Sequence, residues 1–357
     1  MIQPLIIRGY FPTRSNQMER KIVFPFVRIV GQEPMKKALV LNIVDPGIGG
    51  VLVKGEKGTA KSTAVRSLEG IMPRKTVNEG CPFRCETSRP DDACPECKDM
   101  IAAGNPPKGI DAPMRVVELP LSATGDRVTG TLDIEHILKT GERKFDPGIL
   151  AQANGNLLYV DEVNLLDDHL VDLLLDSAAM GVNYVEREGI SYSHPSRFVL
   201  VGTMNPEEGD LRPQLLDRFG MSVDVKGDAD FEKKKEIVRR RIEFDADPAA
   251  YLMAAAKETE ELRRRIREAR DKLPGIGVDD GSLSDVVNIT LNFGIDGHRA
   301  EIAMIRAAKA NAALDGRGKV ARKDVLEVAP LVIAHRLRRR PFESTELNPG
   351  DIERCLS

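Results

Sequence analysis

The chain has 357 residues, which corresponds to about two domains at roughly 150 residues each, and it is long enough to bury a substantial apolar core. With 52 Lys and Arg against 55 Asp and Glu, the composition excludes a strongly cationic nucleic-acid-binding protein, although it leaves room for a local basic patch. Trp is absent and aromatic residues make up only 4% of the chain, so stacking of bases on aromatic side chains is not expected to be its main activity.

Three features bear on the compartment. The sequence has no run of 18 apolar residues, so no transmembrane helix is expected. The first residues lack a basic start followed by a long apolar core, so no signal peptide is expected. Four of the five cysteines fall between Cys81 and Cys97, whereas a secreted disulfide scaffold spreads its cysteines over a short chain. A cytoplasmic protein is therefore expected.

Short apolar strands alternate with helical patterns in the first two thirds of the chain, which predicts a parallel sheet with helices on both faces. Residues 78–113 are rich in Cys, Pro, Gly and Asp and are predicted to form an inserted loop with little regular structure. The other predicted segments are a loose arm at 1–21, strands at 51–53, 115–121, 156–160 and 197–201, and a helix at 62–71.

A helical domain is predicted for residues 230–357. A stripe of mostly apolar residues, spaced three or four apart, predicts a helix of about six turns; its members are Leu252, Ala255, Thr259, Leu262, Ile266, Ala269 and Leu273. Ser282 to Asp285 resembles a capping box that opens the next helix. Further helices are predicted after Gly297 and over 322–337.

The segment from Gly55 to Thr63 is the strongest functional signal, because it follows a predicted strand and opens a predicted helix, as a phosphate-binding loop does. Its glycines let the backbone N–H groups face an anion, and the helix N-terminus adds partial positive charge. Lys61 is expected to reach the β- and γ-phosphates of a nucleotide, and the Ser62 hydroxyl to bind Mg²⁺. The predicted nucleotide-binding residues of the loop are Gly55, Glu56, Lys57, Gly58, Thr59, Ala60, Lys61, Ser62 and Thr63.

One position of this loop departs from the usual pattern, because Ala60 stands where a Gly normally precedes the Lys. A methyl group is tolerated there if the backbone is not at positive φ. The alternative interpretation of the whole segment is a chance Gly-rich turn.

Two further strands end in polar residues that fit a nucleotide site. Asp161 and Glu162 follow an apolar strand; Asp161 is expected to support the Mg²⁺ shell and Glu162 to polarise the attacking water. Asn205 follows the next apolar strand and is expected to orient that water. Ligands of such sheets bind at these strand ends. The alternative interpretation of Asp161 and Glu162 is an acidic turn at a strand end, which is common by itself. That interpretation does not explain why the pair follows a phosphate loop in the chain.

Two arginines complete the predicted set. Arg218 follows a short predicted helix, and Arg299 opens a helix of the C-terminal region. Arg can spread the charge that develops on a transferring phosphoryl group, and one Arg supplied by a neighbouring subunit would make hydrolysis depend on assembly. A surface salt bridge is the commoner role of any single Arg, and it is the position relative to the other motifs that favours the catalytic role.

In this order the motifs resemble those of AAA+ ATPases, and the resemblance implies an α/β P-loop NTPase whose parallel sheet is sandwiched by helices and followed by a smaller all-helical lid domain. The AAA+ core would span 22–229 and the lid 230–357. In this chain the residues that resemble the adenine-packing segment of the superfamily are Ile29, Val30, Gly31 and Gln32, followed by Glu33.

Longer stretches, such as Leu119 to Asp133, Tyr159 to Leu175 and Val201 to Gly220, resemble the ATPase (I) subunit of magnesium chelatase and its cobalt chelatase relatives. The resemblance implies a ring, commonly of six copies, with ATP and Mg²⁺ as cofactors. It also implies two partners, a second AAA+ subunit with a von Willebrand-type domain and a large subunit that inserts the metal into a tetrapyrrole. Magnesium would serve chlorophyll synthesis and cobalt would serve cobalamin synthesis.

The resemblance also assigns roles to single residues. Lys61 and Ser62 match the Walker A motif, and Asp161 and Glu162 match Walker B. The remaining matches are Asn205 with sensor 1, Arg218 with the arginine finger and Arg299 with sensor 2. Residues 119–140 match the helix-2 insert of this clade, and 181–193 match an extra hairpin.

A MoxR-like remodelling chaperone and a helicase-like DNA motor share these inserts and are the alternative functions. A DNA motor should carry basic hairpins, but acidic residues flank Arg187 in the expected hairpin, so no nucleic-acid partner is expected. A non-hydrolysing scaffold is disfavoured by the complete set of site residues.

Cys81, Cys85, Cys94 and Cys97 supply four clustered thiols, and Cys94 and Cys97 have the spacing of one half of a zinc knuckle, because two thiolates three residues apart can bind one tetrahedral ion. The same thiols could instead be redox-active, or hold an iron–sulfur cluster. Cys355 is interpreted as a bystander, and the basic run that begins at Arg336 as a solvated helix end.

Overall fold

The structure is a computed structural model that describes residues 22–132, 145–187, 190–337 and 349–356. The predicted arm at 1–21 lies outside the described residues, as does the stretch 133–140 of the predicted helix-2 insert. The described chain divides into two compact units. One contains Arg74–Tyr159 and Asp176–Val199, and the other contains Val23–Pro73, Val160–Leu175 and the chain from Leu200 onward.

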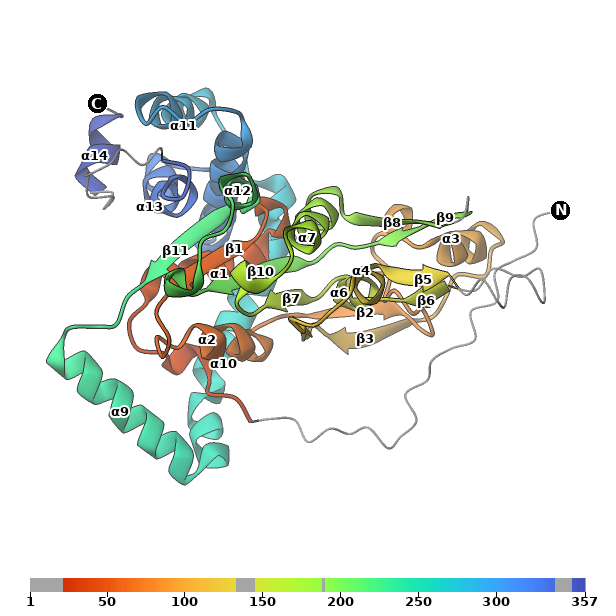
Figure 1. The fold of residues 1–357 in the computed structure, drawn as a ribbon, viewed down its shortest axis with the longest axis horizontal. Coiled ribbons are helices and arrows are strands. Elements are labelled where there is room, and N and C mark those ends of the chain that lie inside the picture. The colour runs from red at the N-terminus through yellow and green to blue at the C-terminus, as the bar shows by residue number, and fades with distance from the viewer. Residues whose placement is uncertain (1–21, 133–144, 188–189, 338–348, 357) are drawn as a thin grey trace. The chain divides into compact units, whose positions relative to one another are not determined.

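A five-stranded sheet has the order β11-β1-β10-β7-β4 (Figure 1). Its strands are β1 (Val51–Gly55), β4 (Val116–Leu119), β7 (Leu157–Val160), β10 (Val199–Met204) and β11 (Met221–Val225). Strand β1 pairs in parallel with both neighbours, so that Val51 lies opposite Val201 and Met221. Every residue of β7 and β10 is buried, as expected for strands covered on both faces. The predicted parallel sheet is confirmed.

Short helices connect the strands of the second unit. They are η1 (Phe26–Arg28), α1 (Glu33–Val44), η2 (Pro46–Ile48), α2 (Lys61–Ser67), η3 (Leu68–Gly70), η5 (Val163–Leu165), η6 (Pro206–Glu208) and α8 (Pro213–Arg218). Helix α7 (Asp168–Met180) starts in this unit and ends in the first. Helix α1 buries almost its whole length, including Met35, Leu39 and Ile43, and so forms a central part of the core.

The C-terminal part of the second unit is helical, as predicted. Its elements are α9 (Phe231–Ala246), α10 (Pro248–Lys272), η7 (Leu273–Gly275), α11 (Asp280–Asn292), α12 (Arg299–Leu314), α13 (Arg322–Ile333) and α14 (Pro349–Arg354). The predicted stripe faces the core through Ala255, Ile266 and Ala269 where α10 packs against α1 and α12. Helix α11 starts earlier than predicted, because Asp279 and not Ser282 caps it by accepting the N–H of Ser282.

In addition to β4 and most of β7, the first unit contains antiparallel strand pairs. They are β2 (Arg74–Asn78) with β3 (Gly109–Pro113), β5 (Gly130–Leu132) with β6 (Phe145–Pro147), and β8 (Val182–Arg187) with β9 (Ile190–Pro195). The unit also contains η4 (Pro90–Asp92), α3 (Pro95–Ala102), α4 (Gly125–Thr129) and α6 (Ile149–Ala153). The hairpin expected over 181–193 is therefore present as β8–β9.

The prediction of little regular structure at 78–113 was wrong. The two ends of this segment pair as β2 and β3, and helix α3 lies between them. Composition failed here because a buried cluster around Phe83, Cys85, Cys94 and Cys97 supplies a core that a Pro- and Gly-rich loop ordinarily lacks.

The described helices include none with the length and apolar character needed to span a bilayer.

Candidate functional site

The predicted phosphate loop curls between β1 and α2. Gly58 has a left-handed φ of 84°, and a Cβ on Gly55 would lie 2.2 Å from the carbonyl oxygen of Val225, so both positions favour glycine. The ammonium of Lys61 donates hydrogen bonds to the carbonyl oxygens of Gly55 and, at 2.7 Å, Glu56. The Lys61 side chain therefore lies within the curl of the loop, where a phosphate ligand would meet it.

Ala60 has a left-handed backbone, with φ 63° and ψ 17°. The condition under which a methyl group is tolerated without strain is therefore not met. An L-residue in this conformation costs roughly 1–2 kcal/mol relative to glycine's freedom to adopt it. The loop thus stores a small strain that a glycine would remove.

Ser62, Asp161 and Thr203 meet at the carboxyl edge of the sheet. Ser62 Oγ lies 3.3 Å from Asp161 Oδ1, and Thr203 Oγ1 donates to the same carboxylate oxygen at 2.6 Å. A hydroxyl and a carboxylate at this separation can share one Mg²⁺ ion, which prefers oxygen ligands. The structure therefore brings together the two residues that the sequence assigned to Mg²⁺.

Thr203 is a site residue that sequence reasoning missed. Its only sequence signal is a polar side chain inside the apolar strand β10, two residues before Asn205. Its hydroxyl also accepts the N–H of Glu162 at 3.3 Å. Glu162 has a left-handed φ of 54°, which is uncommon for a non-glycine residue and occurs often at active sites. Thr203 thus holds both carboxylate residues of the predicted pair.

The electrostatics of the loop follow from partial burial. Burial lowers the pKa of Lys61, and the carboxylates of Asp161 and Glu162 act in the opposite direction. Lys57 extends from the loop to Glu208, with 2.5 Å between its Nζ and Oε1, and this contact raises the pKa of Lys57. Glu208 is a second residue that the sequence did not reveal. The ion pair ties the phosphate loop to the segment after β10.

Asn205 is buried at the end of β10. Met204 is the last residue of β10 paired with β1, opposite Lys54, so Asn205 follows the strand at the edge where the phosphate loop begins. Its side-chain oxygen accepts the N–H of Glu207 at 3.3 Å. Asn164 donates to the carbonyl of Gly209 at 3.2 Å, while its own buried Oδ1 has no hydrogen-bond partner among the described residues.

The two predicted arginines are held by acidic residues of the same unit. Arg218, at the end of α8, forms an ion pair of 2.8 Å with Asp172 of α7. Arg299, at the start of α12, forms one of 2.8 Å with Asp217. Asp217 lies beside Arg218 in sequence, so it links the helical C-terminal region to α8.

Arg336 also binds Asp217, and its interpretation as part of a solvated helix end was wrong. Its side chain is 3% exposed, its Nε lies 3.2 Å from Asp217 Oδ1, and its Nη2 donates to the carbonyls of Asp217 and Phe219. The rest of that basic run, 338–340, lies outside the described residues. Burial lowers the pKa of Arg336, and Asp217 opposes this effect.

The proposed adenine segment forms the turn before α1. Gly31 and Gln32 both have left-handed backbones, and Gln32 donates from Nε2 to the carbonyl of Lys226 at 2.8 Å. Ile29 is buried, and Lys36 donates to its carbonyl at 3.1 Å. This turn therefore connects the start of α1 to the segment that follows β11.

Known proteins resemble this chain over most of its length. Residues 283–355 match the AAA lid domain family. The chain is 50% identical over 340 residues to the magnesium-chelatase subunit ChlI homolog of Methanocaldococcus jannaschii, covering 95% of this chain and 92% of that protein. It is 49% identical to the magnesium-chelatase 38 kDa subunit of Cereibacter sphaeroides, covering 94% and 98%.

The chain belongs to the magnesium-chelatase I-subunit family. Among solved structures, a model of the complex between subunits BchI and BchD of magnesium chelatase matches with 46% identity and a TM-score of 0.53, covering 94% of this chain and 100% of that one. A Cytophaga hutchinsonii protein, 19% identical with a TM-score of 0.59 over 93% and 91% of the two chains, shows the fold alone. The predicted AAA+ fold and family are thereby confirmed.

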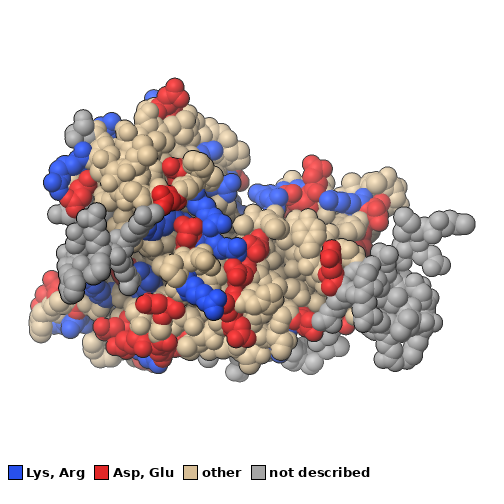
Figure 2. All heavy atoms as spheres, turned by 45° about the horizontal axis from the view of Figure 1, so that its top comes forward, with Lys and Arg blue, Asp and Glu red and all other residues tan. Residues whose placement is uncertain are grey.

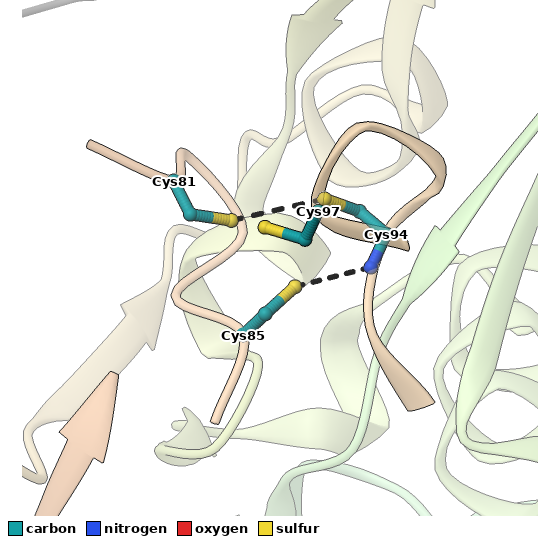
Figure 3. A group of neighbouring side chains, drawn as sticks. All are labelled: Cys81, Cys85, Cys94 and Cys97. Carbon is teal, nitrogen blue, oxygen red and sulfur yellow. Dashed lines mark hydrogen bonds between the residues drawn. The ribbon is translucent and has the colours of Figure 1, made fainter. Parts of the chain in front are cut away.

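The four clustered cysteines of this family member lie in the first unit. Cys81 and Cys85 come from the loop after β2, and Cys94 and Cys97 from the start of α3, and their side chains point toward one another (Figure 3). All four are free thiols. The structure thus brings together every member of the predicted cluster. Cys355 is far along the chain, and its thiol donates a hydrogen bond to the carbonyl oxygen of Asp351.

Proposed function

We propose that this chain is the ATP-hydrolysing motor of a chelatase, and that it couples hydrolysis to insertion of a metal ion into a tetrapyrrole by a separate large subunit. The observation that carries the proposal is the cluster of Ser62, Asp161 and Thr203 next to Lys61 and Glu162. Membership of a family whose relatives are named magnesium-chelatase subunits favours magnesium over cobalt.

Each residue of the cluster has a role that its position supports. Lys61 would bind the β- and γ-phosphates from within the loop, and the loop N–H groups would bind their oxygens. Ser62 and Asp161 would hold the Mg²⁺ of the nucleotide, which supplies charge neutralisation between the phosphates when bound. Glu162, held by Thr203, would accept a proton from the attacking water, and Asn205 would orient it.

Assembly would complete the site. Arg218 lies at the end of α8 and would act as an arginine finger on the nucleotide of a neighbouring copy, while Arg299 would act within its own chain as sensor 2. A closed ring, as the family resemblance implies with commonly six copies, supplies one such neighbour to every site. Hydrolysis would then depend on ring formation.

The partners follow from the same family membership. The solved complex pairs BchI with BchD, and we infer a corresponding AAA+ partner with a von Willebrand-type domain, together with the large tetrapyrrole-binding subunit. Basic side chains lie beside acidic ones over the face drawn in Figure 2. The cytoplasm remains the expected compartment, although the rice relative is named chloroplastic.

A pull-down tests the function directly. The bait is Glu162→Gln held with Mg·ATP in extract of the source organism, with Lys61→Ala as the matched control that should not assemble with nucleotide. Recovery of a very large tetrapyrrole-binding subunit with a von Willebrand-type AAA+ protein by the first bait alone would support the proposal. Recovery of unrelated client proteins would favour the remodelling-chaperone alternative and overturn it.

A further inference from the structure

The four-cysteine cluster has the geometry of a site for one metal ion. The four Sγ atoms all lie within 4.8 Å of one another. A tetrahedral zinc ion with Zn–S bonds of about 2.3 Å holds its sulfurs about 3.8 Å apart. Cys81 Sγ and Cys94 Sγ are separated by 3.8 Å (Figure 3). The thiols are therefore already close to the spacing that one ion requires.

The surroundings of the sulfurs also suit a metal thiolate. Cys85, Cys94 and Cys97 are almost fully buried, with 2%, 1% and 4% of their surface exposed. The backbone N–H of Cys94 donates to Cys85 Sγ at 3.2 Å. Such donors to the ligand atoms are the outer contacts that orient and stabilise thiolates around an ion.

A structural disulfide explains the cluster less well. A disulfide requires an S–S distance of about 2.05 Å, and all four cysteines are free in this structure. One disulfide would leave two of the four thiols unused. Two disulfides would require both pairs of sulfurs to close to about 2.05 Å, whereas Cys81 Sγ and Cys94 Sγ lie 3.8 Å apart. One tetrahedral ion uses all four thiols at about their present spacing. Four protein ligands also close the coordination shell, so the ion would be structural and not catalytic.

The cluster is joined to the β8–β9 hairpin by specific contacts. Glu96 lies between two of the cysteines and accepts the Tyr192 hydroxyl of β9 at 3.0 Å. Phe83 lies between the other two and stacks on His194 with 4.8 Å between ring centroids. The Tyr192 ring stacks on Phe145 at 4.4 Å. An interaction that orders residues 81–97 is therefore expected to order this hairpin as well.

We propose that Cys81, Cys85, Cys94 and Cys97 bind one structural Zn²⁺ ion, and that this ion orders the inserted segment and, through Glu96 and Tyr192, the β8–β9 hairpin. A bound metal ion adds stability to the small buried core that this segment shares with β6 and β9. The inference is independent of the nucleotide site, which lies in the other unit.

Metal content tests the first half of the inference. The full-length chain, purified without chelator, should contain about one zinc per chain by inductively coupled plasma mass spectrometry. Cys85→Ser and Cys94→Ser should lower the zinc content well below half, and Cys355→Ser, which removes the cysteine outside the cluster, should leave it unchanged. Iron in place of zinc, or a disulfide within the cluster by peptide mass spectrometry, would overturn the assignment.

Cobalt substitution keeps the test valid if the Cys→Ser chains do not fold. The unaltered chain, stripped and reloaded with Co²⁺, should show the strong sulfur-to-cobalt charge-transfer absorption and the visible bands of a tetrahedral tetrathiolate site. Absence of these bands in a chain whose four thiols still react with a thiol reagent would exclude the site.

Hydrogen exchange tests the second half. Peptides covering β8 and β9 should exchange faster after the metal is removed, and Tyr192→Phe should speed their exchange while zinc stays at about one per chain. Unchanged exchange of these peptides on metal removal would show that the ion does not order the hairpin.

Discussion

Thr203 donates its hydroxyl to Oδ1 of Asp161 at 2.6 Å, and the same hydroxyl accepts the N–H of Glu162. One side chain thus fixes both the residue assigned to Mg²⁺ and the residue assigned to the attacking water. The contact joins β10 to the end of β7, and Ser62 reaches the same carboxylate from α2. This edge of the sheet is therefore held by a residue that contacts neither nucleotide nor water in the proposed mechanism.

Replacing Thr203 by Val should lower kcat for ATP hydrolysis by about tenfold or more, since a hydrogen bond to a charged group is worth roughly 1.5–3 kcal/mol. Thr203→Ser keeps the hydroxyl and should retain most of the activity. Steady-state phosphate release with both variants distinguishes a positioning role from simple packing, because Val fills the strand as well as Thr does. Equal kcat for the two variants would contradict the role.

Glu162→Gln should bind ATP but hydrolyse it at least about a hundredfold more slowly, because the amide cannot accept the proton of the water. Lys61→Ala should instead lose nucleotide binding, since it removes the cation within the loop. Equilibrium binding of a fluorescent ATP analogue, measured beside phosphate release, separates the two effects. Normal turnover by Glu162→Gln would show that another group activates the water.

Arg218→Ala should bind ATP and lose hydrolysis by a factor on the order of a thousand if it acts as an arginine finger. Mixing Arg218→Ala with Glu162→Gln should restore part of the activity, because some interfaces then contain an intact Arg218 facing an intact Glu162. Phosphate release over a series of mixing ratios provides the measurement. Absence of any recovery at every ratio would argue against action across a subunit interface.

Ala60→Gly should raise stability by about 1 kcal/mol or less, because glycine adopts the left-handed conformation of residue 60 without strain but gains freedom in the unfolded chain. Urea unfolding of the variant and the unaltered chain should show the difference in midpoint. A clear loss of stability would mean that the methyl group of Ala60 makes packing contacts that outweigh the backbone strain.

His335 predicts a pH dependence of stability. Burial, together with the charge of Arg336, holds the pKa of His335 well below its usual value, while its Nε2 lies 3.0 Å from the carbonyl oxygen of Phe219. In the unfolded chain the imidazole takes up a proton near pH 6.5, and in the folded chain it does not. Stability should therefore fall as the pH drops below about 6.5, by up to about 1.4 kcal/mol per pH unit from this group.

The His335→Gln variant should lose this part of the slope between pH 6.5 and 5.5, as measured by urea unfolding. His298→Gln serves as the control, because the His298 side chain is 92% exposed. His194 is also buried with a lowered pKa, so His335→Gln should reduce the slope but not abolish it. An unchanged slope would mean that His335 is protonated equally in both states.

Much of this protein could be predicted from the sequence, because the decisive signals are local. A phosphate loop between a strand and a helix, acidic residues at a strand end and a period of three or four along α10 are set by backbone geometry within a few residues. The parallel sheet and the helical C-terminal region were predicted from such patterns, and the family from the resemblance of longer stretches. The boundaries failed where a neighbouring residue competed, as Asp279 did with Ser282 at the start of α11.

Only the tertiary structure decided which distant residues share one site. Thr203 and Glu208 give weak sequence signals. In the structure Thr203, on β10, hydrogen-bonds Asp161, and Glu208, in the segment after β10, forms an ion pair with Lys57. Arg336 looks like a solvated charge in sequence, but its guanidinium is buried against Asp217 and backbone carbonyls. The cysteine segment looks unstructured because composition reports local preference, while its order comes from side chains of β6 and β9 that lie far along the chain. Contacts of this kind depend on packing between separate elements, and no local pattern encodes them.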